Sequence, residues 1–101
     1  MFQPPEYLIE EKVWVWQGKG VWHFVTIPKE ISEEIKKMFG YLSAQWGSLP
    51  VTLTVGKTTW KTSLFPDTKS ECYFIPIKAE IRKKEGIKEG GIIQISIQIL
   101  V

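Results

Sequence analysis

Apolar and polar residues alternate along much of the chain with the two-residue period of β-strands. The clearest run is Ile92–Val101, where every second residue from Ile93 onward is isoleucine or valine. Shorter runs of the same kind, bounded by glycine, proline or polar turns, predict five more strands. These lie at Tyr7–Trp16, Val21–Ile27, Val51–Val55, Thr58–Phe65 and Glu71–Ile77. A tight turn at Gln17–Gly20 joins the first two into a hairpin, because its glycines tolerate positive φ.

Two short helices interrupt this pattern. Ser32 is placed to cap the first one, since its hydroxyl can accept a free backbone N–H and acidic residues follow it. The buried stripe at helical spacing would comprise Ile31, Ile35, Met38, Phe39 and Leu42. A linker is expected at Ser43–Pro50. The second helix is expected at Lys78–Glu85, with Gly86 suited to a left-handed C-terminal cap.

The fold class expected from these elements is all-β with two short helices. Successive hairpins favour antiparallel pairing, and curling into a small barrel of about six strands would protect the isoleucine-rich edges. The 101 residues suit a single domain at 7–101, preceded by a flexible N-terminus at 1–6 that contains two prolines. The 13% of aromatic residues, including five tryptophans, are expected to build much of the core.

Composition narrows the possible setting of the protein. The net charge of +2 is too balanced to indicate nucleic-acid binding by itself. Three features favour a cytoplasmic protein. The chain has a single cysteine, Cys72, its N-terminus lacks a signal-peptide pattern, and it contains no long apolar run. The chain contains no asparagine and is rich in lysine, glutamate and isoleucine, a bias that fits a heat-adapted source.

Five blocks of sequence resemble one known family. They are Trp22–Pro28 with Ile31 and Ser32, Gly47–Val51, Trp60–Asp67, Tyr73–Lys78, and Arg82 with Glu85–Ile87 and Gly90. In this order, from about Tyr7 to Ile99, they are similar to small bacterial and archaeal domains of unknown function. Members of that family occur alone or fused to a YdeI/OmpD-associated, bacteriocin-protection-like domain.

The resemblance implies a double-split β-barrel and no particular activity. The same fold includes swapped-hairpin transcription factors and antitoxins that bind DNA as dimers, and Ile81–Ile97 resembles their corresponding segment. The chain departs from the family pattern at two places. Gly91 stands where an aspartate commonly follows the glycine, and Ser70-Glu71 stands where a glycine often precedes the tyrosine.

The middle of the chain holds the predicted ligand site. Lys78 and Arg82 lie four residues apart, so their side chains can converge on one helix face. With Thr62 and Ser63 on the neighbouring strand and Trp60 as an apolar wall, they could hold a phosphate or carboxylate. The structural alternative is that Arg82 pairs with Asp67 or Glu85, Ser63 caps a turn, and Trp60 belongs to the core with its indole N–H bonded.

Three functions follow from these residues. The first is a non-enzymatic binding module for a small anionic ligand or a protein partner, with no cofactor and no metal, since one histidine and one cysteine fall short of a metal site. The second is a dimeric DNA-binding protein that uses Arg82–Lys84 and Lys88, although glutamates interleave with this run. The third is an enzyme that uses His23 as a general base. Self-pairing of the final strand would give a homodimer.

Overall fold

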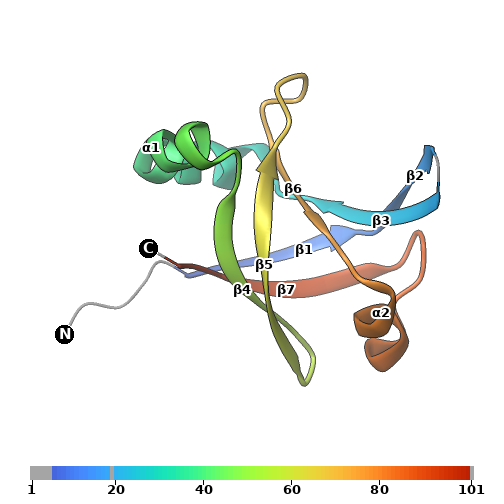
Figure 1. Ribbon diagram of the computed structural model, residues 1–101. Helices are drawn as coiled ribbons and strands as arrows, with labels where there is room; N and C mark the ends of the chain where they lie inside the picture. The colour runs from blue at the N-terminus through green and yellow to red at the C-terminus, as the bar shows by residue number, and fades with distance from the viewer. Residues whose placement is uncertain (1–5, 19, 101) are drawn as a thin grey trace.

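The computed structural model describes residues 6–18 and 20–100, so the predictions that fall on residues 1–5, 19 and 101 lie outside it. This part of the chain forms seven strands and two helices (Figure 1). In chain order they are β1 (Glu6–Lys12), β2 (Trp14–Gly18), β3 (Gly20–Thr26), α1 (Lys29–Trp46), β4 (Leu49–Val55), β5 (Thr58–Pro66), β6 (Tyr73–Pro76), α2 (Ala79–Glu85) and β7 (Ile92–Ile99).

The strands form one curled antiparallel sheet in the order β1-β7-β4-β5-β6-β3-β2, which confirms the predicted all-β, barrel-like fold class. Figure 1 shows the sheet wrapping round, with α1 at one end and α2 at the other. The two strands that end this order, β1 and β2, are consecutive in the chain. The chain itself therefore connects the two edges of the sheet.

The junction between β1 and β2 is Val13, which is 1% exposed. Its N–H donates to the carbonyl of Gly91, and its own carbonyl accepts from the N–H of Gly90. Before Val13 the strand pairs with β7, and after it the strand pairs with β3. The single strand predicted at Tyr7–Trp16 is therefore wrong, and the count rises from six to seven.

Helix α1 is longer than the sequence indicated. It begins at Lys29 directly after Pro28, and Ser32 lies inside its first turns with no capping role. Proline suits this entry because it lacks the N–H that a helix start leaves unpaired. The helix continues to Trp46 and ends at Gly47, whose φ of 80° is left-handed. The predicted linker at Ser43–Pro50 is thus wrong over its first half.

The buried side of α1 consists of Ser32, Ile35, Phe39 and Ser43. Two of these four are serines, so the apolar pattern alone could not place the stripe. Met38, which was predicted to be buried, is 51% exposed because it lies off the narrow side that faces the sheet. In the described part of the chain, neither helix combines the length and apolar character needed to cross a bilayer.

The core lies on the inner side of the curled sheet. In β4 every second residue from Leu49 to Val55 is buried, and Ile95, Ile97 and Ile99 of β7 are fully buried beside them. This confirms the inward face predicted for the final strand. Helix α2 ends as expected at Gly86, where φ is 65°.

A group of buried hydroxyls joins α1 to β6. The Ser32 hydroxyl donates to the carbonyl of Ile27 at 3.0 Å and accepts the N–H of Tyr73 at 3.1 Å. Farther along the helix, the hydroxyls of Ser43 and Tyr73 lie 2.9 Å apart in a second hydrogen bond. Buried polar groups need such partners because an unpaired one costs about 1–3 kcal/mol. These serines therefore fix how the helix sits against the sheet.

The turn between β5 and β6 is organised by Asp67. Its carboxylate accepts the Ser70 hydroxyl at 2.9 Å and the Lys69 N–H at 3.1 Å. These hydrogen bonds, that from Ser70 first, hold the pKa of Asp67 below its usual value. The turn forces Glu71 to a φ of 62°, the only non-glycine positive φ among the described residues.

Replacing Glu71 with glycine should raise the free energy of unfolding by about 0.5–1 kcal/mol. Glycine adopts this left-handed conformation without the clash of a Cβ, and part of that gain is offset by its larger freedom in the unfolded chain. Urea denaturation would measure the effect. Glu80→Gly is the matched control, since Glu80 lies in the first turn of α2 and should lose stability on the same change. A loss of stability in Glu71→Gly would contradict the claim that the backbone is strained at Glu71.

Candidate functional site

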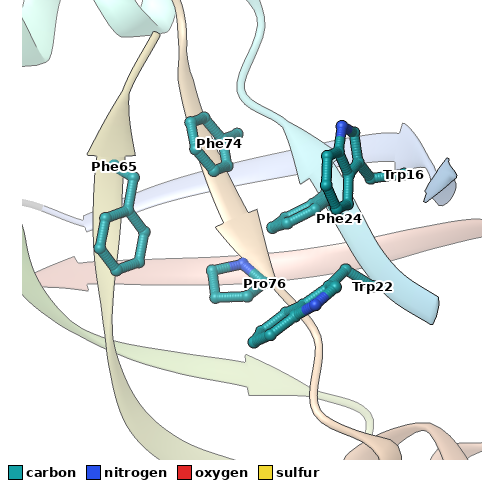
Figure 2. Close-up of a pocket in the computed structure, with 6 residues that line it drawn as sticks. All are labelled: Trp16, Trp22, Phe24, Phe65, Phe74 and Pro76. Carbon is teal, nitrogen blue, oxygen red and sulfur yellow. The ribbon is translucent and has the colours of Figure 1, made fainter. Parts of the chain in front are cut away.

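Four neighbouring strands present aromatic rings on their outer side. The residues, which we call the aromatic face, are Trp14 and Trp16 of β2, Trp22 and Phe24 of β3, Phe65 of β5, and Phe74 and Pro76 of β6. Figure 2 shows six of them around a shallow groove. Phe74 and Pro76 lie between Phe65 on one side and the rings of β2 and β3 on the other.

Strand alternation and register bring these rings together. Val25 and Ile75 are fully buried, so their neighbours Phe24, Phe74 and Pro76 point outward. Across the ladders, Trp14 faces Phe24, Trp16 faces Trp22, Phe24 faces Pro76, and Phe65 faces Phe74. The sheet thus places every ring beside another one.

The rings are held by contacts with each other. Phe24 lies at the centre, with centroid distances of 4.9 Å to Trp14, 6.3 Å to Trp22 and 5.3 Å to Phe74. Such aromatic pairs stabilise each other by about 0.5–1.5 kcal/mol beyond the area they bury. The indole N–H of Trp14 also donates to the Thr26 hydroxyl at 2.8 Å. The surface is therefore organised before any partner arrives.

The aromatic face is open to solvent. Trp16 and Trp22 are 51% and 53% exposed, and Phe65 is 37% exposed. Since a large aromatic side chain has roughly 150–250 Å² of surface, each tryptophan leaves on the order of 100 Å² uncovered. The groove between the rings has a volume of about 350 Å³ and no charged residue lines it. Contiguous apolar patches of this kind mark interaction surfaces.

The strands that carry the aromatic face contribute no negative charge to it. Strands β2, β3, β5 and β6 contain no aspartate or glutamate. Lys61 lies in β5, four residues before Phe65, and Lys78 lies beyond the end of β6, four residues after Phe74, where α2 begins. The two phenylalanines pair between these antiparallel strands. Both lysines are exposed, and because β5 and β6 are antiparallel they lie on the same side of the Phe65–Phe74 pair.

The structure separates the five residues predicted to hold an anion. Thr62 and Ser63 are adjacent in β5, so they point to opposite sides of the sheet. Trp60 and Thr62 share the inner side with the buried Leu64, whereas Ser63 and Lys78 belong to the outer side. Ligand binding by this set stays a prediction.

Arg82 is occupied by other contacts. Its Nε–H donates to the carbonyl of Ile77 at 3.2 Å, and its Nη1 lies 3.5 Å from Nε2 of His23. It does not reach the predicted partners: the Asp67 carboxylate is occupied by its own turn, and the Glu85 carboxylate accepts the hydroxyl of Thr58.

His23 lies on the opposite side of β3 from the aromatic rings. A guanidinium can only donate hydrogen bonds, so Nε2 of His23 must accept the one from Arg82. The ring proton of the neutral His23 is therefore assigned to Nδ1. Nδ1 is shielded from solvent and meets no partner among the described residues. Desolvation first, and the nearby Arg82 charge second, lower the pKa of His23, while Glu89 opposes them. These effects favour the neutral imidazole.

Trp60 packs partly buried against the core, as the structural alternative predicted. Its indole N–H, expected to be hydrogen-bonded, is shielded from solvent and has no acceptor in the described part of the chain. No group of three or more histidine, cysteine, aspartate or glutamate residues there is arranged to hold a metal ion.

Comparison with known proteins gives the family. A family described as domain of unknown function DUF1905 matches residues 10–97. The chain belongs to this family. No curated protein matches the DUF1905 chain. The function of the family is unknown, so the function of this DUF1905 domain must be argued from its surface.

The aromatic face was missed by the sequence analysis, which assigned the aromatic residues to the core. In this DUF1905 domain four of the five tryptophans, Trp14, Trp16, Trp22 and Trp46, are more than a third exposed. A signal was present in the first hairpin. Its strands carry valines on one side and tryptophans on the other, and a small barrel can bury only one of the two sides.

Proposed function

We propose that this DUF1905 domain is a non-enzymatic binding module, and that the aromatic face binds a protein partner. The observation that carries the proposal is the organised, exposed cluster of rings across β5, β6, β3 and β2. These tryptophans leave a large apolar surface in contact with water, which lowers the solubility of the free protein. Tryptophan and other aromatic residues are also enriched among the residues that dominate binding energy.

A protein partner suits this surface better than a small anion. Small-ligand sites bury most of their ligand in a concave pocket that contains a few convergent polar groups. The aromatic groove is open along its length, and its lining has no charged side chain. An open apolar surface gains affinity by excluding water over a wide contact area.

The way the strands are connected supports the double-split form of the predicted barrel. Strand β5 pairs with β4 over most of its length and with β6 only at Phe65 and Pro66. The passage from β1 to β2 likewise changes partner at Val13. Changes of pairing partner at these two places are consistent with a double-split barrel. The aromatic face extends from the end of β5 across β6, β3 and β2.

Selection from a random peptide library tests the proposed function without assuming a sequence. The library would be selected on the wild-type domain and counter-selected on a Trp16→Ala/Trp22→Ala variant. We expect enriched peptides that bind wild type and lose at least about tenfold in affinity on the variant, as for interface hot spots. A Trp46→Ala variant is the control, because Trp46 is equally exposed, at 52%, but lies on α1. Peptides that bind all three proteins equally, or no enrichment, would refute the proposal.

A further inference from the structure

We infer that the partner segment is extended and proline-rich, and that it carries acidic residues at the end that meets Lys61 and Lys78. This inference rests on the proposed function and adds the chemistry of the partner. It draws on three observations: the ring-lined shape of the groove, the state of the sheet edge beneath it, and the placement of charge around it.

The shape of the groove suits a chain that lies across rings. Pro76 and Phe74 lie along its length between Phe65 and Trp22 (Figure 2). Proline rings pack flat against aromatic side chains, and a polyproline II segment is already extended before binding, so little conformational entropy is lost. The neighbouring rings contact each other at 4.9–6.3 Å, so the receptor side is also fixed in advance.

Between β5 and β6, in the middle of the groove, the sheet offers little for a partner that binds by adding a strand. Ile77 donates its N–H to His23 on β3, and Tyr73 accepts from Ile27, so alternate residues of β6 bond toward β3. Pro76 therefore faces the β5 side, where it has no N–H to donate. Pairing with β5 stops at Phe65 and Phe74. A polyproline II partner does not need this ladder, because side-chain rings make most of its contacts.

Charge complementarity decides which residues flank the prolines. Lys61 and Lys78 lie on the same side of the Phe65–Phe74 pair, and the four strands that carry the aromatic face contain no carboxylate. Acidic residues in the partner would face these two cations, and the four strands themselves supply no competing anion. Charges at the rim of an interface mainly steer association and fix orientation. The two lysines therefore select an acidic flank and the direction of the bound segment.

The test uses the intact domain and synthetic peptides with one proline-rich core. One peptide has aspartate and glutamate at its flank, and the other has lysine there. We expect the acidic peptide to bind in calorimetry, with an advantage over the lysine peptide of about tenfold at low salt that shrinks as salt is added. A Lys61→Glu/Lys78→Glu variant should reverse the preference, whereas Lys36→Glu/Lys37→Glu on α1 should keep it. Trp22→Ala, or Trp16→Ala if that variant does not fold, should weaken the acidic peptide at least about tenfold.

Other outcomes would overturn the inference and identify a different occupant. Equal binding of both peptides, or binding of neither, would remove the acidic proline-rich partner. Tighter binding of a single-stranded thymidine oligonucleotide would assign the rings to base stacking. A dimer in light scattering that Trp22→Ala dissociates would assign the face to a second copy of the chain. Library-selected peptides without proline would leave the proposed function standing while refuting this inference.

Discussion

Replacing Leu53 with alanine should lower the free energy of unfolding by about 3–4 kcal/mol. Leu53 is fully buried in β4, where it faces Trp60 of β5 on one side and Ile97 of β7 on the other. The truncation removes apolar contacts and leaves a cavity that neighbouring strands cannot close, because their ladders fix the distance between them. For a small domain with about 5–15 kcal/mol of total stability, this is a large share.

Urea denaturation followed by tryptophan fluorescence would measure the loss. Leu8→Ala is the matched control, since Leu8 also sits in a strand paired with β7 but is 70% exposed. We expect that control to change stability by about 0.5 kcal/mol or less. Similar losses in the two variants would mean that β4 does not lie at the centre of the core.

Replacing Ser32 with alanine should destabilise the domain by about 2–3 kcal/mol. The fully buried hydroxyl of Ser32 satisfies two backbone groups at once, the carbonyl of Ile27 and the N–H of Tyr73. Alanine leaves the Tyr73 N–H without an acceptor at the point where α1, the end of β3 and the start of β6 meet. An unsatisfied buried donor is more damaging than the loss of one average hydrogen bond.

Thermal and urea unfolding of Ser32→Ala would be compared with Ser96→Ala. Ser96 donates a comparable hydrogen bond to Glu6, but that bond is exposed to solvent. The control should therefore change stability by about 0.5 kcal/mol. If Ser32→Ala behaved like the control, the serine would not be the tie between helix and sheet. If instead it gained stability, the two buried hydrogen bonds of Ser32 would not stabilise the fold.

The sequence predicted most strands well because their alternation is a local property. The buried positions in β4 and the isoleucines of β7 follow directly from it. The division of the first strand at Val13 could not be predicted in this way, because both halves keep the same alternation. The change of partner at Val13 depends on Gly90 and Gly91, which lie far away in the chain.

The end and the buried side of α1 were also beyond local reasoning. Ser32 has the composition of a helix cap, yet its hydroxyl is bound by Tyr73, 41 residues away. Gly40 weakens a helix locally, but the packing of Phe39 and the Ser43–Tyr73 hydrogen bond continue α1 to Trp46. Tertiary contacts thus outweighed the preferences of single residues.

The limit of local sequence patterns is even clearer for the predicted anion site. Lys78, Arg82, Thr62 and Ser63 are close in sequence, but strand alternation and the contact with His23 distribute them over different sides of the sheet. The aromatic face combines three sequence segments, which only the register between β2, β3, β6 and β5 brings together. Its detection from sequence would require the strand order, and local patterns do not contain that order.

The five tryptophans provide the most direct test of the aromatic face. In a ¹H–¹⁵N spectrum each indole N–H gives its own signal, and a library-selected peptide can be titrated into the domain while all five are followed. The account predicts that the signals of Trp14, Trp16 and Trp22 shift, while those of Trp46 on α1 and Trp60 on the inner side of β5 stay in place. Shifts of Trp46 or Trp60 with the other three unchanged would contradict it.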